Sequence, residues 1–156
     1  MTALNIVLFA PEIPGNTGSI GRSCLALGAK LHLIRPYGFD LSEKAVRRAG
    51  LDYWKHVDIT EYEDWNHFIE TRSTENLNRL FFLSKFADKT IYETKIEPDS
   101  FLIFGSETKG LPKFIHDQYS QNLFKLPMQS SHVRSLNLSC AATAVAYEAY
   151  RQIHLL

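Results

Sequence analysis

Cysteine is scarce in this sequence. Only Cys24 and Cys140 occur, and both fall in stretches that we expect to be helical. We expect two buried free thiols of a cytoplasmic protein rather than a disulfide between them. No cysteine or histidine pair has the spacing of metal ligands, so the sequence predicts no bound metal.

An excess of charge and a long hydrophobic run are absent as well. Seventeen Lys and Arg residues balance seventeen Asp and Glu residues, so the overall charge gives no argument for nucleic acid and any basic surface must be local. The apolar run 6–10 is far too short to span a bilayer, and the N-terminus lacks the basic region of a signal peptide. We therefore expect a single domain over residues 1–156 that does not enter a membrane.

The sequence does contain an alternation of short apolar runs with helical patterns. Apolar runs that read as buried strands lie at 4–9, 31–34, 57–59, 80–83, 101–104 and 123–126. Helical patterns run from Asn16 or Thr17 to Leu27, before a stop at Gly28, and over 42–49, 64–70, 111–117 and 138–153. This alternation predicts the α/β class, with a single-domain parallel sheet flanked by helices on both faces.

Three segments rich in Gly, Ser and Asn follow apolar runs of this kind, at 16–22, 104–111 and 126–139. Ligands bind to an open α/β sheet at the loops beyond the carboxyl ends of its strands. We therefore expect the three segments to form one composite site.

The glycine spacings suggest two kinds of nucleotide-binding site, and the sequence excludes only one of them. The three glycines over 15–21 follow a strand, but their spacing is not G-x-G-x-x-G and no acidic residue follows the second strand. Arg35 stands there instead and leaves an NADP-dependent oxidoreductase as an alternative. Gly105 and Gly110 have P-loop spacing without the Lys-Ser/Thr that should follow, which excludes nucleotide hydrolysis.

Several polar side chains near these segments each have an ordinary explanation beside a functional one. Arg22 suits a solvated helix face, Glu107 a turn, and Asn137 with Ser139 the start of the last helix. A basic cluster falls at i, i+3 and i+4 and so shares one helix face; its members are Lys44, Arg47 and Arg48. That face is either simply solvated or a contact for phosphates.

The last helical pattern, 138–153, carries small and apolar residues around much of its circumference. A surface helix would show a single apolar stripe. We expect this helix to pack on two sides, and periodicity alone favours a central core helix and a subunit contact equally.

Seven short segments, spread over essentially the whole chain, indicate the protein family better than any single residue does. They are Asn5-Ile-Val-Leu8, Pro11-Glu-Ile-Pro-x-Asn-Thr-Gly18, Arg47-Arg-Ala-Gly-Leu-Asp-Tyr53, Phe104-Gly-x-Glu-Thr-x-Gly-Leu-Pro112, Leu126-Pro-Met128, Arg134-Ser-x-Asn-Leu-Ser139 and Tyr147-Glu-Ala149. On these residues the chain resembles the SPOUT class of knotted RNA methyltransferases. Within the class it is most similar to the small single-domain methylases of tRNA ribose.

The resemblance implies a fold, a reaction and an assembly. The C-terminal part would thread a loop and form a deep trefoil knot. S-adenosylmethionine would bind in the knotted loops of a homodimer whose active sites are shared between subunits. The expected reaction is 2′-O-methylation of the wobble nucleotide 34 of tRNA, a cytidine, and whether a modified uridine there is also a substrate stays open.

The resemblance also assigns residues to roles. Arg22 corresponds to the catalytic arginine, supported by Asn16. The positions implied for the cofactor pocket and its surroundings are Leu83, Gly105, Glu107, Gly110, Leu126, Met128, Ser135, Leu136 and Asn137. A guanidinium holds its proton at neutral pH, so we favour Arg22 binding a phosphate or the reacting hydroxyl and stabilising the developing oxyanion. A role as base stays open if burial or a second cation eases loss of the proton.

Aromatic residues and one further alternative complete the expectations. Phe9, Tyr53 and Trp54 could stack on a splayed anticodon base or pack in the core, with core packing favoured most for Phe9. A non-catalytic RNA-binding module with the same fold remains the third alternative, because it would use the basic face without needing intact cofactor loops.

Overall fold

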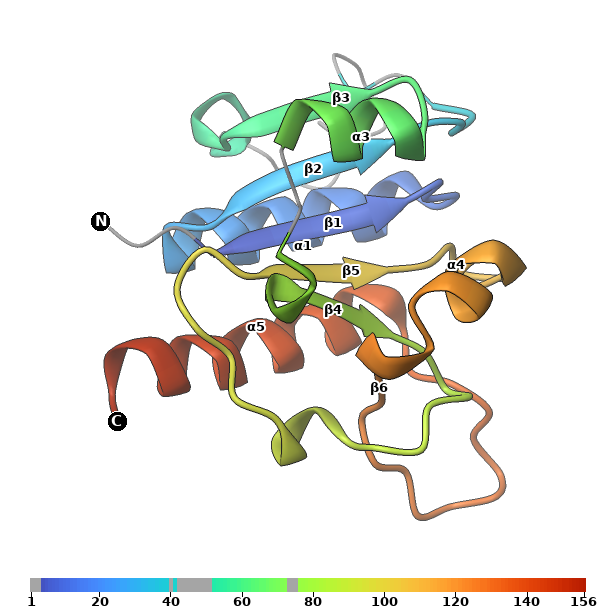
Figure 1. Ribbon diagram of the computed structural model, residues 1–156. Helices are drawn as coiled ribbons and strands as arrows, with labels where there is room; N and C mark the ends of the chain where they lie inside the picture. The colour runs from blue at the N-terminus through green and yellow to red at the C-terminus, as the bar shows by residue number, and fades with distance from the viewer. Residues whose placement is uncertain (1–3, 40, 42–51, 73–75) are drawn as a thin grey trace.

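Six parallel strands form the centre of the structure, in the order β3-β2-β1-β5-β4-β6 (Figure 1). The computed structural model describes residues 4–39, 41, 52–72 and 76–156. The strands are β1 (Asn5–Phe9), β2 (Lys30–Ile34), β3 (Ile59–Tyr62), β4 (Leu80–Leu83), β5 (Phe101–Phe104) and β6 (Leu123–Phe124). Every pair of neighbours is parallel, so the predicted parallel sheet is confirmed.

Helices cover both faces of this sheet (Figure 1). α1 (Pro14–Leu27) and α5 (Leu138–His154) lie side by side on one face, and α3 (Trp65–Arg72) and α4 (Lys113–Gln118) lie on the other. Short 3-10 turns occupy η1 (Trp54–His56), η2 (Leu77–Arg79), η3 (Ile91–Glu93) and η4 (Ser120–Asn122).

Successive strand residues feed two separate cores. Ile6 and Leu8 of β1 pack beneath α1 and α5, whereas Val7 packs beneath α3 and α4. Side chains of a strand alternate between faces, and all three are fully buried. This is why the strands read as continuous apolar runs rather than as alternating ones.

Several predicted boundaries were wrong at their ends. α1 begins at Pro14 and not at Asn16 or Thr17, because proline is accommodated at the first helical position. β3 begins at Ile59 rather than 57, β6 stops at Phe124 rather than 126, and α4 begins at Lys113 rather than 111. Gly28 ends α1 with a φ of 66°, as predicted. The predicted helix 42–49 lies outside the described residues.

The two cysteines differ in their surroundings. Cys24 is fully buried in α1, and burial raises the pKa of its thiol to about 12. Cys140 is exposed in the first turn of α5, so the expectation of a buried thiol there was wrong. α5 buries one stripe, made of Ala142, Val145, Ala146 and Ala149.

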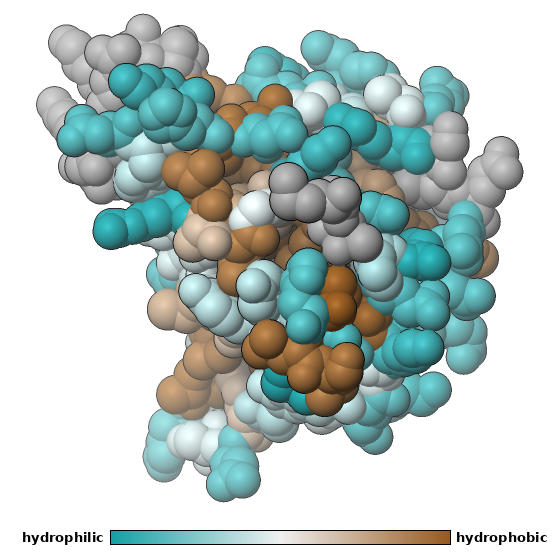
Figure 2. Space-filling view, turned by 90° about the vertical axis from the view of Figure 1, so that its left-hand side faces the viewer, coloured by the Kyte–Doolittle hydropathy of each residue, from teal (hydrophilic) through white to brown (hydrophobic). Residues whose placement is uncertain are grey.

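The molecule is mainly hydrophilic where the strands begin. Figure 2 views this end, and teal side chains dominate it with smaller groups of hydrophobic atoms between them. Within the described part of the chain, no helix combines the length and the apolar character needed to cross a membrane.

A series of side-chain hydrogen bonds, mostly buried, runs across three neighbouring strands from α3 to the first residue of β1. Arg72 Nε donates to Tyr62 Oη, and Tyr62 Oη lies 2.9 Å from His32 Nδ1. His32 Nε2 lies 2.9 Å from Asn5 Oδ1, and Asn5 Nδ2 donates to the Ser100 carbonyl. Because the Asn5 amide oxygen only accepts, Nε2 of His32 carries the proton and Nδ1 accepts from Tyr62.

This series of buried hydrogen bonds makes the stability of the fold sensitive to acid. Burial, helped by the positive charge of Arg72, lowers the pKa of His32 to about 3 from its ordinary 6.5. The folded state therefore keeps His32 neutral where the unfolded chain would protonate it. The stability contributed by the neutral histidine is complete above about pH 6.5 and is lost as the pH falls from there toward 3, by at most about 1.4 kcal/mol per pH unit.

We predict that His32→Gln will flatten the pH dependence of stability between pH 7 and pH 4, since glutamine can keep both hydrogen bonds without titrating. Urea denaturation at several pH values measures it. His154→Gln, at an exposed histidine, is the control and should keep the wild-type slope. An unchanged slope in His32→Gln would show that other groups cause the acid sensitivity.

Candidate active site

Three loops meet at the carboxyl edge of the sheet. The first loop (10–13) joins β1 to α1, the second loop (105–112) joins β5 to α4, and the third loop (126–137) joins β6 to α5. β1 pairs with β5, which places the first two loops side by side. The third loop projects beyond β6 and returns behind the sheet to α5 (Figure 1). The predicted first segment, 16–22, is not a loop but the start of α1.

The first and second loops exchange hydrogen bonds through two carboxylates. Glu107 accepts from the backbone nitrogens of Glu12 and Ile13. Glu12 in turn accepts from the Thr108 backbone nitrogen at 3.2 Å and from its hydroxyl at 2.6 Å. Glu107 therefore faces the first loop, although the resemblance implied a place by the cofactor pocket.

A pair of asparagines connects the third loop to the start of α1. Asn137 Nδ2 donates to Asn16 Oδ1 at 3.1 Å, and Asn16 is buried. The Asn137 side chain also accepts from the backbone nitrogens of Ser139 and Cys140 and so caps α5, as predicted. Asn16, Glu107 and Asn137, which are distant in sequence, therefore belong to one junction.

The second loop closes on itself through its glycines. Ser106 and Gly110 exchange backbone hydrogen bonds of 3.2 Å and 2.9 Å, and Gly110 has a φ of 66°, where glycine is favoured. A Cβ atom on Gly105 would lie 2.1 Å from the carbonyl carbon of Gly110 and 2.2 Å from the Leu111 nitrogen. Gly105 is thus required by the loop's own backbone.

The other residues implied for the cofactor pocket fall into two groups. Leu83 and Leu126 are half-buried against the core beneath α1 and α5. Ser135 is exposed in the third loop, and Met128 and Leu136 leave 40% and 45% of their surfaces exposed. Apolar side chains open to solvent on a twelve-residue loop suit a surface that a ligand or another chain covers.

Arg22 stands exposed on α1, six residues beyond Asn16 and so about 9 Å along the helix axis. Its guanidinium carbon lies 5.6 Å from the centre of the Tyr53 ring, and Tyr53 Oη donates to the Gly18 carbonyl. Burial raises the pKa of Tyr53, and the Arg22 charge works against that shift. No carboxylate among the described residues forms an ion pair with Arg22, so its charge is available to a phosphate.

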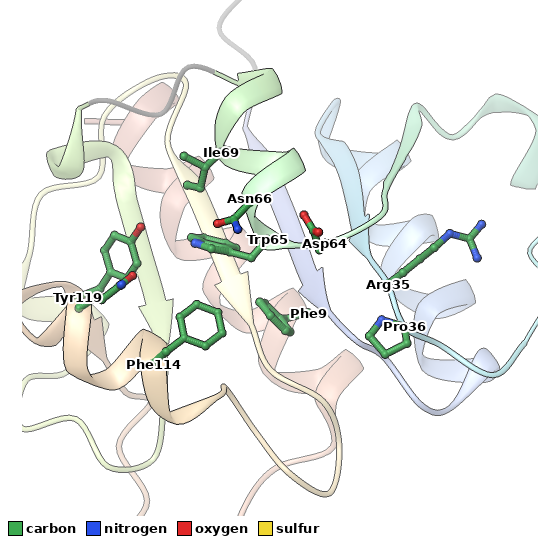
Figure 3. Close-up of a pocket in the computed structure, with 10 residues that line it drawn as sticks. Phe9, Arg35, Pro36, Asp64, Trp65, Asn66, Ile69, Phe114 and Tyr119 are labelled. Carbon is green, nitrogen blue, oxygen red and sulfur yellow. The ribbon is translucent and has the colours of Figure 1, made fainter.

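The aromatic residues considered for base stacking have different surroundings. The Trp54 ring packs on Gly21, where an added Cβ would lie 2.5 Å from it, and the indole nitrogen donates to Leu41. Phe9 is half-buried at the end of β1, with its ring centroid 6.0 Å from that of Trp65 and 6.1 Å from that of Phe114. The rings of Phe9, Trp65 and Phe114 line an open groove of about 560 Å³ between α3 and α4 (Figure 3).

The predicted basic face cannot be placed. Lys44, Arg47 and Arg48 lie outside the described residues. In the described part of the chain, no group of three or more His, Cys, Asp or Glu residues could hold a metal ion.

One buried polar atom at the junction lacks a partner. Thr17 Oγ1, next to Asn16 in the first turn of α1, is buried without a hydrogen bond and is alone in this among the described side chains. Buried hydroxyls are normally satisfied, so Thr17 is an exception within α1. The glycine-rich backbone of the second loop and the exposed apolar side chains of the third loop fit a ligand with polar and apolar parts, as S-adenosylmethionine is.

Comparison with known proteins identifies the family. Residues 3–147 match the model of the SpoU rRNA Methylase family. The chain belongs to the SpoU rRNA methylase family. This confirms the resemblance drawn from the sequence, and it favours methyl transfer over the oxidoreductase and the non-catalytic module.

Individual relatives of the SpoU methylase family cover nearly the whole chain. A tRNA (cytidine(34)-2′-O)-methyltransferase of Saccharophagus degradans is 45% identical over 150 residues, 96% of this chain and 95% of its own. A solved structure presented as structural insights into the 2-OH methylation of C/U34 on tRNA has a TM-score of 0.88 and 42% identity, covering 97% of this chain and 96% of its own.

A more distant neighbour bears on the cofactor. The SpoU methyltransferase AviRb of Streptomyces viridochromogenes, solved in complex with the cofactor AdoMet, has a TM-score of 0.83 and 27% identity. The match covers 97% of this chain and 58% of that one.

Sequence reasoning missed Glu12 and Thr108. Glu12 lies just before α1 but does not cap it. An acidic residue at that place without a capping role was the only signal in the sequence that could have pointed to it. Its partner Thr108 lies 96 positions away, and no local pattern reports a contact over that separation.

We predict that Gly105→Ala will weaken binding of S-adenosylhomocysteine at least about tenfold and destabilise the fold by about 1–3 kcal/mol, because the clash is with backbone that cannot rotate away. Calorimetric titration and thermal denaturation measure the two effects. Gly15→Ala is the control, since nothing lies within 4 Å of an added Cβ there and alanine favours the helix. Unchanged affinity in Gly105→Ala would contradict the role given to the second loop.

Proposed function

We propose that this chain transfers a methyl group from S-adenosylmethionine to the ribose 2′-hydroxyl of nucleotide 34 in tRNA. The observation that carries the proposal is likeness along nearly the entire chain, at 42–45% identity, to proteins named for this reaction. The convergence of three loops at one edge supports it, because a methyl donor and a nucleotide need adjacent subsites. S-adenosylmethionine supplies an activated methyl group in this reaction.

The residues of the chain have two tasks in this scheme. The second and third loops, through Gly105, Gly110 and the segment around Ser135, hold the cofactor, with Leu83 and Leu126 beneath. Arg22 binds the nucleotide's phosphate or its 2′-hydroxyl and stabilises negative charge that develops on the oxygen. Holding the two reactants in line can itself remove ~7–11 kcal/mol of the barrier. Lys44, Arg47 and Arg48 are the proposed phosphate contacts outside the described residues.

We also propose a knotted chain and a homodimer, in the cytoplasm. The long third loop and the return of α5 to the face of α1 (Figure 1) support the knot. Exposed apolar side chains on this face support the dimer: Leu25 and Tyr147 are 39% and 53% exposed. Ala144, between the third loop and Tyr147 in sequence, is exposed as well and permits close approach of a second chain.

We predict that Arg22→Ala will lower turnover by ~10²–10³-fold, the usual cost of removing one stabilising group at an oxyanion, while cofactor affinity changes little. Methyl incorporation from labelled cofactor, mapped to the nucleotide by mass spectrometry, measures turnover and position together. Arg35→Ala is the control, since Arg35 also stacks on a tyrosine, at 5.0 Å from the Tyr37 ring centre. Label in a base rather than a ribose would refute the reaction, and full turnover by Arg22→Ala would refute the role.

The dimer gives a further prediction. Wild-type protein should have twice the chain mass of 17.8 kDa in light scattering, and Tyr147→Glu should shift it to the monomer with loss of methylation, because a buried charge opposes association. Tyr92→Glu is the matched control, since Tyr92 is 54% exposed and lies in η3 rather than on α1 or α5. A fully active wild-type monomer at micromolar concentration would rule the dimer out.

A further inference from the structure

The contacts between the first and second loops are reciprocal. The Glu107 carboxylate accepts from two backbone nitrogens of the first loop, at 3.0 Å from Glu12. The Glu12 carboxylate accepts from the backbone and hydroxyl of Thr108. Each loop therefore presents a carboxylate to backbone donors of the other, and we call these four hydrogen bonds the clasp.

The clasp supplies what α1 lacks at its own beginning. The residue before the helix, Ile13, has no side chain that can cap it, and the first turn contains no acidic residue. The N-terminus of a helix carries unpaired N–H groups and partial positive charge. Glu107 brings a carboxylate from the second loop to the backbone nitrogens just before the helix, so the negative charge at the start of α1 comes from the loop proposed to hold the cofactor.

Glu12 fixes the second half of the same junction. Its hydrogen bonds to Thr108, the hydroxyl first and the backbone next, lower the pKa of the Glu12 carboxyl, so it stays ionised at neutral pH. Thr108 is flanked by the residues whose backbones close the second loop, Ser106 and Gly110. A change in the second loop's closure is therefore felt at Glu12.

The helix that the clasp holds carries the two residues assigned to catalysis. Asn16 and Arg22 are both on α1, and a helix moves as a rod on this scale. Asn16 also contacts Asn137 of the third loop. A shift of the α1 start relative to the second loop would displace the Arg22 guanidinium relative to the cofactor subsite, and misplacements of this kind cost rate rather than binding.

We propose that Glu12 is a positioning residue, which through Thr108 couples occupancy of the cofactor loop to the placement of α1 and its Arg22. This inference rests on the proposed function for the role of Arg22. Glu12 itself touches neither reactant. The coupling requires that cofactor binding order the first turns of α1.

The experiment compares Glu12→Ala, Thr108→Val and the double variant. Each single change should lower kcat about tenfold, the value of one charge-assisted hydrogen bond, with KM for tRNA and the affinity for S-adenosylhomocysteine changed less than about threefold. The double variant should lose no more than the worse single one, because both remove the same contact. Glu12→Gln keeps an acceptor oxygen and should restore most turnover. Glu70→Ala, at an exposed acid of α3, is the control and should have no effect.

Hydrogen exchange supplies a readout that does not need tRNA. S-adenosylhomocysteine should slow exchange of the α1 amides over 16–22 in the wild type and in Glu70→Ala. It should fail to do so in Glu12→Ala at saturating ligand. Equal protection in Glu12→Ala would overturn the proposal, as would strictly additive losses in the double variant. If wild-type protein bound the ligand but methylated no tRNA, the proposed function would fail while the exchange result still decided the coupling.

Discussion

The parallel pairing of β1 with β5 is the constraint on which the rest of the structure depends. It sets Leu8 opposite Phe104 and so starts two loops, nearly a hundred residues apart in sequence, at adjacent points. The chain leaves β1 toward α1 on one face and leaves β5 toward α4 on the other (Figure 1). Divergence of this kind opens a crevice at the carboxyl ends of neighbouring strands, and the loop junction is built there.

The sheet supplies stability and the junction supplies geometry. Two cores bury both faces of every central strand, whereas most contacts of the junction are hydrogen bonds between exposed groups. Hydrogen bonds between exposed groups replace bonds to water and so add little net stability, too little to decide whether the chain folds. They suffice to choose among loop positions of similar energy, which is what a site assembled from three loops requires.

The sequence predicted what local rules control. The strand at 101–104 and the end of α1 at Gly28 were correct, because burial on both faces leaves a continuous apolar run and a left-handed cap calls for glycine. The predicted start of α1 was wrong because Pro14 occupies the first helical position, and Ile13 before it is held by Glu107 through a tertiary contact. Cys140 was expected to be buried because free cysteines usually are, and helix periodicity could not correct this where small residues occur all round.

The candidate site was predicted in its membership but not in its connections. Asn16, Glu107 and Asn137 were singled out from motifs, and the structure joins all three to one junction. Motifs could not tell that Glu107 accepts hydrogen bonds from the first loop, nor that Gly105 is needed for its close approach to Gly110. Such facts depend on distances across loops that no spacing within one segment encodes.

The apolar side chains of the third loop are left open to solvent, and this has an energetic consequence. Met128, Val133 and Leu136 expose 40%, 47% and 45% of their surfaces on one loop, and covering such groups is favourable by about 25 cal/mol per Å². A chain acting alone would gain from burying them in its own core, which the sheet's two faces already fill. Their burial therefore stays available to stabilise the binding of whatever molecule covers this loop. A similar argument applies to Arg22, whose charge has no carboxylate partner among the described residues. A guanidinium already paired within the chain would have to break that pair before it could bind a phosphate.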